Sequence, residues 1–308
     1  MSAEVETMMY VREKPWHGLG TEVAEAPTSA DALRFAGLDW KVEQEPVCNV
    51  RGGVIPGYKA NVRDRDGSVL GIVGTRYKVV QNEDAFQFTD GLIGGKVRYE
   101  TAGSLRGGRQ IWLLAKMETC RVAGDEVEPY LCFTNAHDGS SGVKVCMTPI
   151  RVVCNNTLNL ALNGAKRSWT MRHTESIHER LNEARDCLFR ANEYMAGLNA
   201  YAENAVDIRL WDSDIKAILN ELFPVTEKST EREKANAEKC KSEFMVCYFA
   251  PDIVKFRGTA WGFINAASDF VTHSMPHRNT QNYAENNWGR IMDGHAIMDK
   301  AVKLCMAR

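Results

Sequence analysis

The hydrophobic period of this chain changes once, close to Pro149. Before that residue, short stretches of alternating apolar and polar residues are separated by turn signals, which is typical of β-hairpins. After it, apolar residues recur every three or four positions, as on one face of a helix. Because strands and helices are segregated along the chain, we predict an α+β fold. This fold combines an antiparallel hairpin sheet over about residues 47–147, crossed by a helix, with a mostly helical C-terminal half that contains one long helix.

Turn-forming residues divide the β-rich part into three hairpins. The first turns at Asp66-Gly67, the second at the glycine-rich and cationic GSLRGGRQ, and the third at HDGSSG, residues 137–142. The paired segments are 58–64 with 68–80, 96–102 with 109–116, and 130–135 with 142–147. Short helices are predicted at residues 29–36 and 82–92, the second with Asn82 as its cap.

The stretch TPIRVVCNNTLNLAL, residues 148–162, mixes apolar residues with polar ones. Val153, Leu158 and Leu162 lie on one helical face, which predicts a helix over residues 150–162 after the third hairpin. Two adjacent β-branched residues in its first turn also allow a strand that continues into a helix. The polar residues would lie on one edge, where they cap the backbone or contact phosphate: Arg151, Asn155, Asn156 and Asn159.

The clearest helical period lies between Ser176 and Val206. Ser176 and Glu179 match a capping box, and the apolar residues after them alternate four and three apart. This seam consists of Ile177, Leu181, Ala184, Leu188, Ala191, Met195, Leu198 and Ala202. It predicts either a helix that binds a partner or a second copy, or a long helix packed across its own domain.

Further helices are predicted at residues 210–223, 258–273 and 289–306, the first of them capped by Asp212 or Ser213. Residues 226–241 are highly charged and form either a mobile loop or a solvated helix, in which Thr230 and Glu233 match a second capping box. We therefore divide the chain into a β-rich core with an irregular N-terminal segment, residues 1–172, and a helical region, residues 173–308.

Composition and missing motifs argue against several classes of protein. Hydrophobic residues make up 44% of the 308 residues and charged residues 25%, as in a folded domain. No long apolar stretch suits a transmembrane helix and the acidic N-terminus does not suit a signal peptide, so we expect a cytoplasmic protein without membrane contact. The nine cysteines form no CxxC pair, and neither HExxH nor GxxxxGK[ST] occurs. No metal, cofactor or catalytic residue is predicted, and nothing in the spacing supports Cys154 and His173 as a hydrolytic pair.

Positive charge is concentrated in the middle of the chain, although the net charge is −2. Residues 51–172 contain 17 Lys and Arg against 11 Asp and Glu, whereas the rest of the chain has 21 against 29. Several cations lie beside aromatic residues, as in surfaces that neutralise phosphates and stack on unpaired bases. The candidate nucleic-acid-binding residues are Arg76, Tyr77, Lys78, Arg98, Tyr99, Arg106, Arg109, Lys144, Arg151, Asn155, Lys166, Arg167, Trp169 and Arg172. The alternative is that these aromatic residues lie in the core and the cations solvate strand edges.

Four motifs connect the chain with a known family: ETMMYVREKPWHGLGTEV, VLGIVGTRYKVVQNEDAFQF, TPIRVVCNNTLNLAL and GTAWGFINAASDFVTH. They occur in the right order, and the resemblance extends from about Glu6 to Leu304. The chain resembles the phage/plasmid-like protein family, long catalogued as a domain of unknown function. The resemblance implies a protein of a phage, prophage or plasmid, without specifying an activity.

The layout of three hairpins followed by a helix is more loosely similar to that of phage single-strand annealing proteins. This likeness implies rings or filaments that hold single-stranded DNA in a basic groove between sheet and helices, without ATP. Two features depart from that pattern: no domain is strongly basic, and about 130 C-terminal residues are helical and acidic.

The sequence therefore leaves three candidate functions for the protein. The leading expectation is an oligomeric, ATP-independent protein that binds and anneals single-stranded DNA in the bacterial cytoplasm, with host or phage replication proteins as further partners. The alternative is a structural or host-interaction protein, for example an inhibitor of a host defence system, that acts through the helix at residues 176–206. The third is an enzyme whose site includes the Asn-rich residues 275–288.

Overall fold

The computed structural model of the protein describes residues 5–11, 20–24, 28–93, 98–151, 168–177, 179, 181–182, 191–274 and 295–308. The chain forms two compact units. Unit 1 comprises Met1–Glu118, Tyr130–Met147 and Arg167–Ala191, and unit 2 comprises Thr119–Pro129, Thr148–Lys166 and Asn192–Arg308. Each unit is assembled from three stretches, so the two units interleave along the sequence. Antiparallel strands dominate the first part of the chain and helices the second, which confirms the predicted α+β class.

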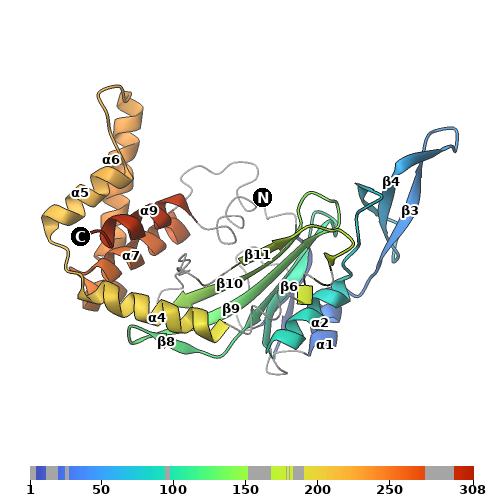
Figure 1. Ribbon diagram of the computed structural model, residues 1–308, viewed down its shortest axis with the longest axis horizontal. Helices are drawn as coiled ribbons and strands as arrows, with labels where there is room; N and C mark the ends of the chain where they lie inside the picture. Colours follow the sequence, from blue (N-terminus) through green and yellow to red (C-terminus); the bar gives the residue numbers. More distant parts are fainter. Residues whose placement is uncertain are drawn as a thin grey trace. The chain divides into compact units, whose positions relative to one another are not determined.

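The large sheet contains eight strands within the described residues. They are β1 (Val5–Val11), β2 (Thr21–Val23), β6 (Arg98–Leu105), β7 (Gln110–Lys116), β8 (Cys120–Val122), β9 (Asp125–Ala136), β10 (Val143–Arg151) and β11 (Ser168–Met171). Their order is β11–β10–β9–β7–β6–β1–β2, with β8 paired to β9 (Figure 1). The second and third predicted hairpins are confirmed as β6–β7 and β9–β10. The position of β1 between β6 and β2 was not predicted.

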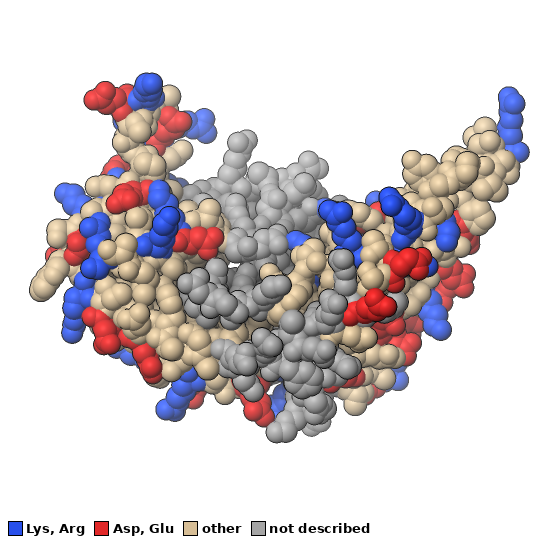
Figure 2. Space-filling view, viewed as in Figure 1, with Lys and Arg blue, Asp and Glu red and all other residues tan. Residues whose placement is uncertain are grey.

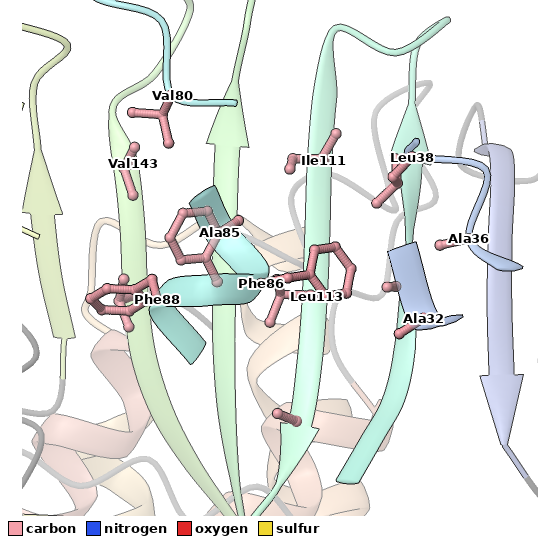
Figure 3. Packing of buried hydrophobic residues seen from close by; sticks show 14 of the residues in the cluster. Ala32, Ala36, Leu38, Val80, Ala85, Phe86, Phe88, Ile111, Leu113 and Val143 are labelled. Atoms are coloured by element: carbon pink, nitrogen blue, oxygen red, sulfur yellow. The ribbon is translucent and has the colours of Figure 1, made fainter. Parts of the chain in front are cut away.

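Two helices, α1 (Ser29–Phe35) and α2 (Asn82–Ile93), pack on one face of this sheet in unit 1 (Figure 3). Both match the predicted helices at residues 29–36 and 82–92. Because successive strand residues point to opposite faces, the inward residues of each strand meet the apolar faces of the helices. The resulting core includes Ala32, Ala36, Leu38, Ala85, Phe86, Ile111, Leu113, Phe133 and Val143.

A second, three-stranded sheet, which we call the arm, extends from the rest of unit 1 (Figure 1). Its strands are β3 (Val42–Cys48), β4 (Val54–Arg63) and β5 (Val69–Gly74), in that order. The first predicted hairpin is β4–β5, whose turn includes Gly67 at φ +71°. The second strand ends at Gly74 rather than at residue 80 as predicted, because Tyr77 turns towards the end of the large sheet and bonds Ala136 O.

Of the two interpretations of residues 150–162, a helix from the first residue is wrong, and a strand at the start is confirmed. Ile150 and Arg151 continue strand β10, and β11 pairs back onto β10 with Cys146 opposite Ser168. The remainder of that helix, including Asn155, lies outside the described residues, as do Lys166 and Arg167.

Besides β8 and the start of β9, unit 2 contains the helices α4 (Ala191–Asp207), α5 (Asp212–Leu222), α6 (Glu231–Tyr248), η1 (Pro251–Phe256), α7 (Ala260–Asp269), η2 (Phe270–Ser274) and α9 (Ala296–Cys305). An aromatic group forms its core, in which the Phe244 ring lies 4.7 Å from Phe263 and 5.8 Å from Phe270. Helix α7 is buried over most of its length, including Trp261. No helix among the residues that the structure describes is long and apolar enough to cross a membrane.

Two predicted helix starts have different outcomes. The capping box at α6 is confirmed, since Thr230 N–H donates to Glu233 Oε2 at 2.8 Å. The predicted cap of α5 is wrong, because Trp211 occupies the N-cap position. Its backbone N–H donates to Asp214 Oδ2 at 3.0 Å.

The residues of the predicted seam whose side chains the structure describes are buried. Ile177 and Leu181 belong to the core of unit 1, whereas Met195, Leu198 and Ala202 are buried in the part of α4 assigned to unit 2. Residues 183–190 lie outside the described residues, so one continuous long helix stays a prediction. Because these five seam residues are buried, the structure favours internal packing over a partner-binding seam.

The cysteines of the described chain differ sharply in exposure, which predicts their order of alkylation. Cys48 is exposed at the end of β3, whereas burial raises the pKa of Cys247 and Cys305 to about 12. Iodoacetamide at pH 8 is therefore expected to modify Cys48 more than about tenfold faster than Cys247 or Cys305, as read by peptide mass spectrometry. Equal rates in the native protein would contradict the described packing, and equal rates in denaturant provide the control.

Candidate nucleic-acid interface

Four segments from distant parts of the chain meet at one end of the large sheet, which we call the loop end. They are residues 75–80 after β5, the β6–β7 turn, the β9–β10 turn and the residues after β11. Backbone bonds join them: His137 N–H donates to Arg109 O at 2.7 Å, and Lys78 N–H donates to His173 O at 3.2 Å. The Tyr77 hydroxyl donates to Ala136 O at 2.7 Å. All four segments belong to unit 1.

Five of the predicted cations are brought together at the loop end. Arg76, Arg109 and Arg172 are exposed, and each lies on a different one of these segments. Lys78 is half-buried, and its Nζ forms an ion pair with Glu175 Oε1 at 2.7 Å. Arg106 is half-buried in the β6–β7 turn, at a positive φ of 55°. We call these five residues the loop-end cluster.

Other predicted cations lie elsewhere or cannot be placed. Arg98 begins β6 opposite Lys116, at the far end of the β6–β7 pair from the turn. Lys144 is half-buried near the start of β10, close in sequence to the loop end, and Arg151 ends that strand. Asn155, Lys166 and Arg167 lie outside the described residues. The sequence therefore identified the cationic segments but not which of them share a surface.

The prediction that Tyr99 stacks on bases is wrong. Its ring is 1% exposed and lies 5.2 Å from the ring of Phe86 in the core. Its hydroxyl lies 2.8 Å from Asp90 Oδ1, and burial raises its pKa. Tyr99 instead anchors α2 to the sheet.

The other two predicted aromatic residues are also largely packed. The Tyr77 ring stacks on His173 with a centroid distance of 4.3 Å and an interplanar angle of 15°. Trp169, opposite Val145 in the β10–β11 pair, packs against the core of unit 1. Both side chains are half-buried, so neither presents an open ring face like that of a single-strand stacking platform.

A buried polar network that the sequence does not predict lies beneath the loop end. Asn82 does not cap α2 as predicted; its amide nitrogen donates to Leu38 O at 3.0 Å. Its Oδ1 is therefore the acceptor for His137 Nε2, also at 3.0 Å. The Asn61 side chain, from the arm, donates to His137 O at 2.7 Å. Burial holds the pKa of His137 at about 3, so its ring is neutral.

The second histidine supports the same end of the sheet. His173 Nδ1 donates to Lys78 O at 2.8 Å, and burial lowers the pKa of this ring. The two neutral imidazoles fix the backbone of the loops without adding charge. A signal for His137 is present in the sequence, because Phe133, Asn135 and His137 alternate on the core face of β9 and then meet the turn.

An ion-pair network fixes the arm beside the β6–β7 turn. The Arg63 guanidinium donates to Glu6 Oε1 at 2.8 Å and to Asp66 Oδ2 at 2.7 Å, and it lies 5.5 Å from the Trp40 ring centroid. The hydrogen bond from Arg63 lowers the pKa of Asp66. A Cβ at Gly108 would approach Arg63 Nη1 to 3.0 Å, so this glycine allows the cationic turn to lie against the arm.

Charge on the face of the molecule shown in Figure 2 is mixed rather than of one sign. In the face shown in Figure 2, Lys and Arg side chains lie among Asp and Glu side chains over the described parts of the chain. Among those parts, no group of three or more His, Cys, Asp or Glu side chains is arranged to hold a metal ion. A polyanion would therefore be bound by a local set of cations, and the loop-end cluster places five of the predicted cations at one end of the sheet.

Comparison with known proteins identifies the family but no activity. No curated protein and no solved structure matches the chain. The family model described as a domain of unknown function, DUF932, matches residues 69–290. This range covers more than two thirds of the chain and includes the whole loop-end cluster, whereas β3 and β4 of the arm precede it. The chain therefore belongs to the DUF932 family, which confirms the predicted membership in a family of unknown function.

Proposed function

We propose that the protein binds single-stranded DNA at the loop-end cluster and anneals complementary strands without a nucleotide cofactor. It acts as an oligomer in the cytoplasm of a bacterial host, in the recombination or replication of a phage or plasmid. One observation carries this proposal: separate loops bring Arg76, Arg109 and Arg172, all exposed, to the same end of one sheet. Guanidinium groups spread over a fixed surface suit the successive phosphates of a single strand.

The support beneath the cluster favours a fixed surface over a flexible one. Backbone hydrogen bonds tie Arg109 and Lys78 to the two histidines, and the Tyr77–His173 stack lies between those segments. No ion pair among the described residues involves Arg76, Arg109 or Arg172. Phosphate can therefore approach these three side chains without first displacing a described carboxylate.

The burial of the predicted aromatic residues changes the expected mode of binding. With Tyr99 in the core and Tyr77 stacked on His173, the strand would be held mainly through its phosphates. Its bases would then stay open to a complementary strand, as annealing requires. The alternative function through residues 176–206 gains less support, because the described seam residues are buried.

DNA binding is tested by fluorescence anisotropy with a labelled single-stranded oligonucleotide. Affinity is expected to fall steeply between about 50 and 200 mM salt, because binding releases counterions. Combining Arg76→Ala, Arg109→Ala and Arg172→Ala is expected to weaken binding at least about tenfold and to reduce the slope of log Kd against log salt by about 2. The slope change follows from the loss of three phosphate contacts.

A matched triple variant separates the cluster from overall charge. Lys216→Ala, Lys228→Ala and Lys303→Ala remove three exposed cations from unit 2 and change the net charge equally. This control is expected to bind nearly as the wild type does. Equal weakening by both triple variants, or no wild-type binding at low salt, would contradict the proposal.

A further inference from the structure

The outer face of the arm exposes several large apolar side chains to solvent. In the β4–β5 ladder Tyr58 lies opposite Gly74 and Ala60 opposite Ile72, so these residues share one face. Val69 lies opposite Val62, beyond a register shift between Asn61 and Val62; Val62 is buried, whereas Val69 is exposed. Tyr58, Val69 and Ile72 are each more than half exposed. A contiguous apolar surface of this kind marks an interaction site.

Charge on this face is negative. Glu43 and Glu45 lie opposite Val62 and Ala60, which places both exposed carboxylates on the same outer face. The two cations within the arm strands, Lys59 and Arg63, alternate to the other face. We call Tyr58, Ala60, Val69, Ile72, Glu43 and Glu45 the arm face.

One edge of the arm, β3, is unsuited to strand addition. β3 is an edge strand and contains Pro46, which lacks the N–H that a further strand would need. β4 contains Pro56 beyond the last pair with β5, at Tyr58 and Gly74, where it would otherwise form a second open edge. The β3 edge therefore does not favour strand addition, whereas the exposed apolar residues of the arm offer a surface on which a partner can pack.

Unit 2 carries a surface of matching chemistry. Val246 and Phe249 lie three residues apart at the end of α6, and Val254 follows in η1. All three are more than half exposed. Trp211 is three-quarters exposed. The N–H of the preceding Leu210 donates to Gly258 O at 3.0 Å, which holds Trp211 close to the segment after η1. We call Trp211, Val246, Phe249 and Val254, with the cations named next, the helical patch.

Two arginines, Arg209 and Arg257, flank the apolar residues of the helical patch. Arg257 lies over the Phe249 ring at 4.9 Å, and its Nη2 donates to Phe249 O at 3.1 Å. Arg209 is exposed two residues before Trp211, while Asp212 is the acidic residue directly after it. An apolar surface with cations at its side thus faces solvent on unit 2, and an apolar surface with carboxylates faces solvent on unit 1.

We infer that the arm face of one copy docks on the helical patch of a second copy of this chain. Burial of the two apolar surfaces supplies the driving force, and pairing of Glu43 and Glu45 with Arg209 and Arg257 sets the orientation. Such a contact joins two different surfaces, so it repeats from copy to copy and closes into a ring or continues as a filament. The inference supplies the contact for the oligomer in the proposed function and rests on that proposal in this respect alone.

Two pairs of substitutions test the contact in the full-length protein without DNA. The arm variant carries Tyr58→Ser and Ile72→Ser, and the patch variant carries Val246→Ser and Val254→Ser; all four positions are exposed, so folding should be retained. Sedimentation velocity at micromolar concentration is expected to show wild-type species of at least twice the 34.5 kDa of one chain. Each variant alone is expected to be monomeric, whereas Val225→Ser, at an exposed position outside both surfaces, is expected to assemble normally.

An equimolar mixture of the two variants gives the decisive result. Each variant retains one intact surface, so the mixture is expected to form species of two chains and nothing larger. A monomeric wild type, a patch variant that still self-associates through its arm, or a mixture that stays monomeric would overturn the inference.

A charge exchange provides a second measurement at the same contact. Glu45→Arg and Arg257→Glu should each reduce the assembled fraction, and their combination should restore it. Failure of the combination to restore assembly, with circular dichroism unchanged, would count against the pairing. Anisotropy of the arm variant keeps the two proposals distinguishable, because its loop-end cluster is intact and DNA binding is scored independently of mass.

Discussion

Acidification below pH 6.5 is expected to lower the free energy of unfolding by up to about 1.4 kcal/mol per pH unit through His137 alone. The ring is buried, and burial holds its pKa at about 3 against 6.5 when it is exposed in the unfolded chain. Between these two values the unfolded state binds a proton that the folded state excludes. Stability is therefore fully present above pH 6.5 and is lost progressively as the pH falls towards 3.

The measurement is urea unfolding followed by tryptophan fluorescence at several pH values between 5 and 7.5. His137→Gln keeps a side-chain amide that can donate to Asn82 but cannot titrate. The variant is expected to lose less stability than the wild type as the pH falls. The difference between their free energies of unfolding should therefore narrow by about 1.4 kcal/mol for each pH unit. Parallel pH profiles would show that His137 is not held neutral by burial. His173, whose pKa burial also lowers, acts in the same direction in both proteins.

Replacement of Arg63 by Ala is expected to cost about 3 kcal/mol of stability. The Arg63 side chain is only 10% exposed and binds two carboxylates, from Glu6 in β1 and from Asp66 in the β4–β5 turn. Its loss removes the hydrogen bonds that join the arm to β1 of the large sheet and the packing of the guanidinium on Trp40. Both carboxylates are partly exposed, so water compensates in part and the cost lies at the lower end of the range for buried pairs.

The adjacent Arg65 provides the matched control. Arg65 pairs with Asp39 at 3.5 Å, and its side chain is 63% exposed. Arg65→Ala is expected to change stability by less than about 1 kcal/mol, as for other exposed pairs. Chemical denaturation of the two variants at the same pH and salt compares them directly. Equal losses of stability would mean that the Glu6–Arg63–Asp66 network does not anchor the arm.

Local chemistry made the hairpins and several helices predictable. Gly67 adopts a positive φ of 71° in the Asp-Gly turn that the sequence predicts, and Gly107, Gly108 and Gly139 do so in the other two turns. Thr230 and Glu233 form the capping box that their spacing predicts. Such features depend on residues within a few positions of one another, so a single sequence contains the information that fixes them.

The burial of Tyr99 follows from the alternation of residues along β6. In Arg98-Tyr99-Glu100 the period of two directs the outer residues to one face and Tyr99 to the other, and the apolar face of β6 is the one that α2 covers. A tyrosine between two charged residues in a strand is thus an inward residue. Tyr77 lies outside any strand, so alternation does not place it; its contacts with Ala136 and His173 do.

Long-range polar contacts could not be predicted from local pattern. Asn82 looks like a helix cap, yet its partners are Leu38 and His137, 44 and 55 residues away. Arg63 and Glu6 are separated by 57 residues and lie in different sheets. Nothing in the residues around either position specifies which distant strand will lie beside it.

The separation in sequence of the segments at the loop end has a consequence for protein synthesis. Tyr77 meets Ala136 across 59 residues, and Lys78 meets His173 across 95. A nascent chain therefore cannot assemble the cationic surface until residue 173 has left the ribosome and the sheet has closed, and contacts of such range form slowly. A nascent chain that ends before residue 173 should thus lack the assembled cationic surface. Affinity for a polyanion should arise only late in synthesis and mark completed folding.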